Sequence, residues 1–395
     1  MIEMIEGRTI LCFASGYDAP PTSKHHVMHL LARRNTVLWV NYHASRAPTA
    51  RSSDLFYMAR KLSQVAGGLF RARRNLHVLT PLVVPLPSSP WARRLNRLLL
   101  VAQVRTALAS LRRGPLQIWS FTPDVSYALG RFGEERVVYY CVDEFAAFSG
   151  YDRKQVQADE ADLCRRADLV VTTSLALQAA KLPWNPNTIL VPHGVDYDHF
   201  RTALCEDLAE PDDLVGIPRP RLGFFGLIRD WVDLEMLSEV ARRREDWHFV
   251  LIGDSTVDLA VYSGLANMHF LGRKKYADLP AYCKGFDVGL IPFVVNELTA
   301  AVNPIKLREY LAAGLPVVSS PLPEVEAYRG QAAVVKTAEE FEAAVTAALR
   351  SPPDARRRRS EAMSGETWEG KLEFICRSLA DLPAGRKAAA AGVRL

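Results

Sequence analysis

Short apolar runs alternate with longer segments of helical spacing along almost the whole chain. Such runs are typical of strands buried inside parallel sheets. We predict strands at 9–15, 36–41, 76–81, 116–121, 136–143, 169–174 and 187–192, and a second series at 221–226, 247–253, 268–272, 286–293, 315–320 and 332–336. This alternation predicts an α/β protein of two Rossmann-like parallel-sheet domains that face each other across a cleft, with ligands at the carboxyl ends of the strands.

The most informative stretch is Phe286 to Ser320, FDVGLIPFVVNELTAAVNPIKLREYLAAGLPVVSS. It predicts a strand, a loop, a helix over 304–313 and a second strand. Asn303 and Pro304 mark the start of the helix. A helix that begins at a strand end offers free N–H groups and a positive dipole end, and Lys306 adds a charge in the first turn. The segment therefore predicts a phosphate site, which suggests a bound nucleotide.

The same residues resemble the donor-binding segment of GT-B glycosyltransferases, particularly the bacterial glycosyltransferase family 4 and its group 1 relatives. Three further segments are similar to that family: ILVPHGVDYDHF at 189–200, HFLGRKKYADLPAYCKGFDVGLIPF at 269–293 and ETWEGKLEFI at 366–375. Together they cover most of residues 188–376, whereas the N-terminal half matches only in outline.

The resemblance implies a division of the chain into domains. It places an acceptor-binding domain at 1–196, a linker at 197–220 and a nucleotide-sugar-binding domain at 221–365. A closing helix at 366–382 would cross back to the first domain, and a tail at 383–395 would fray.

Several residues of the second domain are candidate donor contacts. By resemblance, Lys306 would offset the diphosphate charge and Glu309 would accept hydrogen bonds from the ribose hydroxyls; an ordinary ion pair between the two is the alternative. Asn303 and Pro304 would lie at the same helix start. The other candidates follow strand ends and are Gly226, Arg229, Gly253, Asp254 and Arg273, of which the arginines could also be plain exposed loop residues.

Two departures from the family pattern leave the chemistry open. Leu227 stands where the family carries an arginine that grips the diphosphate, and Arg229 is the expected substitute. Ala301 stands where retaining members carry a glutamate that touches the sugar, and Glu297 could replace it only if its loop curled inward. The sequence therefore does not decide between retention and inversion.

In the first domain, Asp143 is the candidate catalytic base because it ends the strand RVVYYCVD. A role in capping the next helix is the alternative. Gly16 would let backbone approach the donor phosphates. Lys24, His25 and His26 are secondary electrostatic candidates, and His193 is expected at a hinge.

The charge is distributed unevenly. Residues 1–120 hold 17 Lys and Arg against 4 Asp and Glu, a net charge of +13, whereas the whole chain carries +5. Much of it lies in two segments, 60–74 and 91–113, where arginines alternate with apolar residues. Such segments could lie on an anionic membrane, with Trp91, Leu95 and Leu98 to Leu100 inserted, or could pack on their own domain.

The composition favours a cytoplasmic protein, at the inner face of the plasma membrane if the basic segments bind lipid. The six cysteines have no paired spacing, and no apolar run is long enough to span a bilayer. We expect no signal peptide, no bound metal despite the Asp196–Asp198 pair, no cofactor other than the donor, and no nucleic-acid partner.

The sequence thus predicts a metal-independent glycosyltransferase that moves a sugar from a nucleotide diphosphate, UDP being the expected nucleotide, to a lipid-linked or glycan acceptor. A nucleotide-sugar epimerase of the same fold is one alternative. A non-catalytic partner in a polysaccharide assembly complex is another, because of Leu227 and Ala301.

Overall fold

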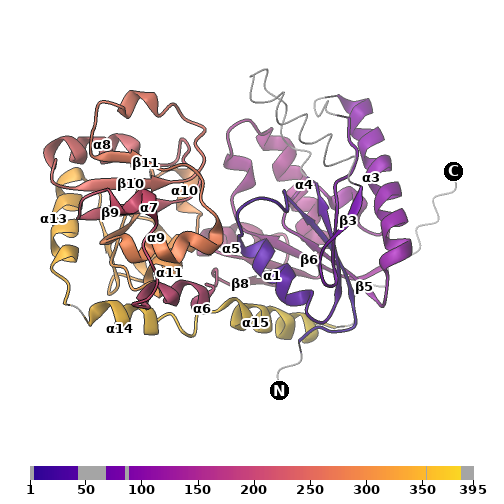
Figure 1. Ribbon diagram of the computed structural model, residues 1–395. Helices are drawn as coiled ribbons and strands as arrows, with labels where there is room; N and C mark the ends of the chain where they lie inside the picture. The colour runs from indigo at the N-terminus through magenta and orange to yellow at the C-terminus, as the bar shows by residue number, and fades with distance from the viewer. Residues whose placement is uncertain (1–3, 43–67, 85–88, 353, 384–395) are drawn as a thin grey trace. The chain divides into compact units, whose positions relative to one another are not determined.

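The chain folds into two compact units (Figure 1). The computed structural model describes residues 4–42, 68–84, 89–352 and 354–383. The first unit comprises the chain up to Pro192 together with the residues from Leu372 onward, and the second comprises His193–Lys371. The segment 197–220, which the sequence suggests as a linker, lies within the second unit. Helix α15 (Trp368–Ala380) begins in the second unit and continues in the first, as expected of a helix that crosses back.

The first unit is built on a sheet with the strand order β3-β4-β2-β1-β5-β6-β7-β8. Its strands are β1 (Thr9–Ala14), β2 (Thr36–Asn41), β3 (Leu69–Arg73), β4 (Leu76–Leu79), β5 (Leu116–Ser120), β6 (Glu134–Cys141), β7 (Leu169–Thr172) and β8 (Thr188–Leu190). All neighbours pair in parallel except β3 and β4. The sequence analysis missed β3 and was wrong to assign its residues to an amphipathic segment. The rest of that segment up to residue 67 lies outside the described residues.

Helices connect most of the parallel strands and pack on the sheet. They are α1 (Ser23–Leu31), α3 (Pro90–Leu111), η1 (Ser126–Ala128), η2 (Phe145–Ala147), α4 (Arg153–Arg166) and α5 (Leu175–Lys181). The central strands carry large apolar side chains on both faces and are buried, so that Trp39, Trp119, Tyr139 and Tyr140 are all fully buried, whereas the edge strand β3 is largely exposed. The chain begins in the middle of the sheet with β1 and adds the next strands on one side of it. From β5 onward it adds strands on the other side of β1, so the topological switch point lies between β1 and β5.

The second unit contains a parallel sheet with the strand order β11-β10-β9-β12-β13-β14. The strands are β9 (Arg221–Phe225), β10 (His248–Ile252), β11 (Met268–Phe270), β12 (Val288–Ile291), β13 (Val317–Ser319) and β14 (Ala332–Val334). Its switch point lies between β9 and β12, because the chain proceeds outward from β9 on one side and returns as β12 on the other. Ligands are expected beside the carboxyl ends of these two strands.

The helices of the second unit are α6 (Tyr197–Phe200), η3 (Arg201–Leu204), α7 (Asp212–Val215), α8 (Leu234–Arg243), η4 (Ala260–Tyr262), η5 (Tyr276–Asp278), α9 (Leu279–Gly285), α10 (Glu297–Ala300), α11 (Ile305–Ala312), α12 (Pro323–Glu326), α13 (Ala338–Leu349) and α14 (Ala355–Glu361). Helices α8 and α13 pack on each other, while α11 packs on α6 and α14 (Figure 1). Helix α11 therefore lies between the sheet and α6, the first helix of the second unit.

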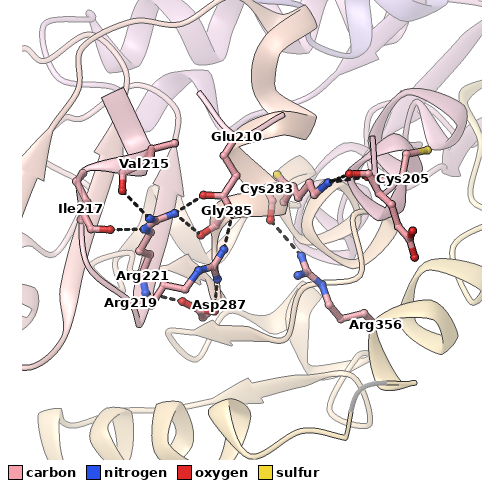
Figure 2. Close-up of polar contacts among 12 residues, drawn as sticks. Cys205, Glu210, Val215, Ile217, Arg219, Arg221, Cys283, Gly285, Asp287 and Arg356 are labelled. Carbon is pink, nitrogen blue, oxygen red and sulfur yellow. Dashed lines mark hydrogen bonds and ion pairs between the residues drawn. The ribbon is translucent and has the colours of Figure 1, made fainter. Parts of the chain in front are cut away.

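Ion pairs and hydrogen bonds hold residues 205–221 at the amino-terminal edge of the second sheet (Figure 2). Arg221 is buried, and its guanidinium donates to Glu210 at 2.6 Å and to the carbonyl of Ile217 at 2.7 Å. Arg219 bridges Glu210 and Asp287 at 2.7 and 2.5 Å. This network lies at the edge of the sheet opposite the predicted ligand site, so we assign it a structural role.

Within the described residues, every helix is too short or too polar to span a membrane.

Candidate functional site

The glycines that follow β9 and β10 bring the backbone close together at the carboxyl edge of the second sheet. Gly226 and Gly253 have φ values of 144° and 148°, which side chains rarely adopt. A Cβ atom on Gly253 would lie 1.8 Å from the carbonyl oxygen of Gly226, and one on Gly226 would lie 2.3 Å from Cε of Lys306. Both glycines are therefore required for the local packing, and the structure places Gly226 beside the predicted phosphate-binding lysine and Gly253 against Gly226.

Helix α11 presents Lys306 to this edge. The Lys306 ammonium lies 5.6 Å from the ring centroid of Phe224 and 6.0 Å from that of Phe293. Pro304 occupies the cap position without a side-chain hydrogen bond to the helix. The first N–H groups of a helix have no partner within it, so the start of α11 combines such donors with a nearby ammonium.

Tyr310 fixes the distance between α11 and the sheet. Its ring occupies the space that a side chain at Gly289 would fill, with the nearest ring atom 2.7 Å from a Cβ at that position. Its hydroxyl accepts a hydrogen bond from the Phe225 N–H at 3.1 Å. Because Phe225 precedes Gly226, this contact sets the position of Lys306 relative to the glycine turn. The sequence analysis did not identify this role.

Glu309 is 4% exposed, so a solvated ion pair on the helix surface does not describe it. Burial raises the pKa of its carboxyl to about 7; the Lys306 charge opposes this shift, while Asp196 adds to it. A buried carboxyl beside a lysine and a glycine turn is the kind of group that ligand hydroxyls can satisfy.

This pKa predicts how Glu309→Gln changes stability with pH. The unfolded chain ionises the carboxyl near 4.5 and the folded chain near 7, so the contribution of the neutral carboxyl is complete below pH 4.5 and is lost as the pH rises through 7. We expect the variant to match the wild type in melting temperature at pH 4.5 and to melt higher at pH 8. Exposed Glu245→Gln is the control and should behave alike at both pH values. An equal effect of Glu309→Gln at both pH values would contradict the expectation.

Asn303 is also buried, but its amide is already engaged within the protein. Its Nδ2 donates to Glu324 at 2.9 Å and its Oδ1 accepts from Arg308 at 2.7 Å. The side chain that the sequence suggested as a ligand contact therefore binds protein groups, and only the backbone around it adjoins the start of α11.

The loop after β9 places Arg229 against an aromatic ring. The Arg229 guanidinium lies 4.7 Å from the ring centroid of Trp231, and its Nε is buried without a hydrogen bond. Leu227, which stands in place of the family arginine, is 42% exposed. Arg229 is thus the cation that this loop offers near the glycine turn, and Trp231 holds it.

Asp254 and Arg273 lie close to one another at the ends of β10 and β11. Their closest charged atoms are 3.8 Å apart, and both side chains are well exposed. An ion pair between exposed side chains contributes little to the stability of the fold. Either side chain could therefore leave its partner and contact a ligand at a small cost in free energy.

The loop after β12, which includes the short helix α10 (Glu297–Ala300), contains both residues that bear on the family glutamate. Ala301 is buried, and Glu297 begins α10 as an exposed residue. Thr299 and Asn296 bond reciprocally at the start of α10, which fixes the direction of Glu297.

The candidate base of the first unit, Asp143, follows β6 at the carboxyl edge of that sheet. Lys24, at the start of α1, donates to the Ser15 hydroxyl at 2.5 Å. Burial lowers the pKa of Lys24 to about 8, and attraction to Asp143 opposes that shift. The sheet edge thus brings Lys24, Ser15 and Asp143 together next to Gly16, although the sequence had ranked Lys24 as secondary. The cap position before η2 belongs to Glu144, which makes no side-chain cap bond.

His25 is structural. Its Nδ1 accepts from the Thr22 N–H and its Nε2 lies 3.1 Å from the Tyr17 carbonyl, so the neutral ring carries its proton on Nε2. Burial lowers the pKa of His25 to about 3, which keeps it uncharged at neutral pH. It therefore does not act as a cation in the site.

Comparison with known proteins identifies the second domain. Residues 219–351 match the family model for glycosyl transferases group 1. Over these residues the second unit is similar to the group 1 glycosyltransferases. This confirms the predicted resemblance, and the matched residues contain Gly226, Gly253, Lys306 and Glu309.

A curated relative and several solved structures are similar to this chain. TuaH of Bacillus subtilis (strain 168), named for a proposed role as a glycosyltransferase in teichuronic acid biosynthesis, is 29% identical over 222 residues, or 52% of this chain. The match spans 55% of TuaH, about half its length.

Three structures match nearly the whole chain at low identity. HepE from Anabaena, in complex with UDP-glucose, has a TM-score of 0.64 at 15% identity and covers 95% of this chain and 100% of its own. Sucrose-phosphate synthase from Thermosynechococcus elongatus has a TM-score of 0.68 at 14% identity, and the match covers 94% of this chain and 98% of that structure. The α,α-trehalose-6-phosphate synthase from Burkholderia multivorans has a TM-score of 0.64 at 14% identity, and the match covers 95% of this chain and 98% of that structure. At these identities the likeness concerns the fold alone, and it confirms the predicted GT-B architecture.

Proposed function

We propose that this protein transfers a sugar from a UDP-sugar to a hydroxyl of a lipid-linked or polysaccharide-precursor acceptor. The observation that carries the proposal is the cluster of Gly226, Gly253, Lys306 and Glu309 at the switch point of the second sheet. It combines a close backbone approach, a cation at a helix start and a buried carboxyl, and lies within the segment that matches group 1 glycosyltransferases.

Each group has a distinct role in the proposed reaction. Lys306 and the N–H groups at the start of α11 stabilise the diphosphate, whose negative charge grows as it departs. Glu309 accepts hydrogen bonds from the ribose hydroxyls. Asp143 accepts the proton of the attacking acceptor hydroxyl, and Lys24 holds its carboxylate by charge. We expect these side chains to act without a bound metal and without a cofactor other than the donor.

The choice of donor and acceptor rests on relatives and is part of the proposal. HepE has been crystallised with UDP and with UDP-glucose, and the name of TuaH refers to the biosynthesis of teichuronic acid. A donor of the same nucleotide class and a glycan or glycan-lipid acceptor are consistent with both.

One experiment separates transfer from its alternatives. The purified protein is incubated with UDP-sugars, with and without a bacterial lipid extract, and the products are analysed by mass spectrometry. Transfer predicts UDP release together with a glycosylated lipid or glycan. An isomerised sugar without acceptor would indicate an epimerase. Binding without any product would favour a non-catalytic partner, which the exposed Leu227 and the buried Ala301 keep as the second candidate.

Contact with an anionic membrane is part of the same proposal. One side of α3 is buried through Leu100, Val104 and Leu108, so for Leu100 the alternative of packing on its own domain holds and that of insertion into lipid does not. The first turns of α3 expose Trp91 and Leu98, at 59% and 70%, with Arg94 on the same face, and they also expose Arg93 and Arg97, of which Arg97 lies 4.8 Å from the Tyr127 ring centroid. An exposed apolar pair flanked by arginines suits an anionic lipid surface.

Replacing Arg93 and Arg94 by glutamine is predicted to weaken binding to phosphatidylglycerol-containing vesicles by roughly thirtyfold, since each juxtamembrane arginine contributes about 1 kcal/mol. Vesicle sedimentation at low and high salt measures this. Replacement of the exposed Arg357 and Arg358 of α14 by glutamine changes the net charge equally and serves as the control. An equal loss of vesicle binding in the two variants would exclude this surface as the membrane contact. Equal binding of the wild type to neutral and to phosphatidylglycerol-containing vesicles would exclude it as well.

A further inference from the structure

A buried arginine stands directly behind the candidate donor site. Arg308 belongs to α11, between Lys306 and Glu309, and is 2% exposed. Its guanidinium donates to Oδ1 of Asn303 at 2.7 Å, while Nδ2 of Asn303 donates to Glu324 at 2.9 Å. Both ends of the Asn303 amide are thereby fixed, and so is the backbone just before Pro304.

The other side of the same guanidinium faces Glu366. Nε of Arg308 lies 3.6 Å from the Glu366 carboxylate, which also binds Lys371 at 2.7 Å. Burial alone would raise the pKa of Glu366, but the hydrogen bond and charge of Lys371 and the charge of Arg308 hold it below its ordinary value. An ionised Glu366 is therefore the expected partner of Arg308 at neutral pH.

Glu366 lies where the chain passes between the two units. Its carbonyl accepts the Val195 N–H at 2.8 Å, and Val195 pairs with Thr367 in a parallel bridge. The first passage follows Pro192 and the second follows Lys371. Arg308 thus contacts both the loop before α11, through Asn303, and the paired segments around Val195 and Glu366, which lie next to the two points where the chain passes from one unit to the other.

Stability alone does not explain this arrangement. A buried ion pair is often no more stable than apolar residues of the same volume, and Nε of Arg308 is buried without a hydrogen bond. The arginine does fix the position of the helix start that carries Lys306 and Glu309. Fixing a binding group before the ligand arrives reduces the entropy lost on binding.

We propose that Arg308 is a positioning residue for the donor diphosphate. Through Asn303 and Glu366 it holds the loop before α11 in the conformation that receives the phosphates. The proposal rests on the proposed function, since it assumes that α11 binds a nucleoside diphosphate.

The test is calorimetric titration with UDP at a temperature well below every melting point. Arg308→Met is expected to weaken UDP binding about tenfold or more. Arg308→Lys keeps the charge near Glu366 but cannot bridge both partners, so it should bind with intermediate affinity. Glu366→Gln is a milder variant that removes the charge partner and should also weaken binding.

A matched control comes from the opposite edge of the same unit. Arg221 is equally buried and paired with Glu210 (Figure 2), so Arg221→Met should lower the melting temperature while leaving the UDP affinity unchanged. Unchanged affinity in Arg308→Met and Glu366→Gln, or equal loss in Arg221→Met, would overturn the positioning role alone. Absence of UDP binding by the wild type would overturn the donor proposal and this inference with it.

Discussion

Asp143→Asn is expected to lower the rate of sugar transfer by roughly 10²- to 10⁴-fold, the range that general-base catalysis supplies. The amide keeps the size and hydrogen-bonding shape of the side chain but cannot accept the proton of the acceptor hydroxyl. Asp143 lies in the first unit, whereas Lys306 and the glycine turns at Gly226 and Gly253, on which the proposed UDP site is built, lie in the second. UDP affinity should therefore remain unchanged. Transfer is measured as UDP release in the presence of the acceptor fraction, and affinity by calorimetry.

Asp152→Asn is the matched control, since Asp152 caps α4 by accepting the Gln155 N–H at 3.1 Å. Asparagine caps helices about as well as aspartate, so this variant should retain both transfer and stability. Transfer by Asp143→Asn at a rate near the wild type would rule out Asp143 as the base.

Lys306→Ala should weaken UDP binding by roughly ten- to a hundredfold, because a hydrogen bond to a charged group contributes about 1.5–3 kcal/mol. Turnover should fall as well, since the same charge stabilises the departing diphosphate more strongly than the bound donor. The Michaelis constant for the UDP-sugar and the turnover number, measured together, separate these two effects.

Lys284→Ala provides the comparison at the opposite edge of the unit. Lys284 donates to the carbonyls of Cys205 and Glu206 at 2.8 and 2.6 Å, so its loss removes the same charge and two hydrogen bonds away from the site. This variant should bind UDP normally. Wild-type affinity in Lys306→Ala would remove α11 from the phosphate site.

The sequence predicted the strands and the helix start well because these depend on local patterns. Apolar runs locate the buried strands, and the Asn-Pro pair before a helical segment locates the start of α11. The edge strand β3 was missed because its residues, LFRAR, are largely exposed and arginine-rich, which is also the pattern of an amphipathic segment. Edge strands commonly carry such charges to prevent further pairing.

The features that the sequence did not reveal depend on contacts between distant residues. Arg308 and Glu366 are far apart in the chain, so no local pattern identifies their pair. The burial of Glu309, and with it the raised pKa, depends on α6 and Asp196 packing against α11. Leu100 reads as one more apolar residue of a basic helix, and only the packing of α3 shows that it faces the core.

The most direct test of the central claim is a thermal-shift comparison of UDP, GDP, ADP, TDP and CMP, each with Mg²⁺ and with EDTA. A ligand that binds only the folded state raises the melting temperature by mass action. The account predicts a selective rise with UDP that is the same with and without the metal. No rise with UDP, or a rise that requires Mg²⁺, would contradict a donor site built from Lys306, Glu309 and the two glycine turns.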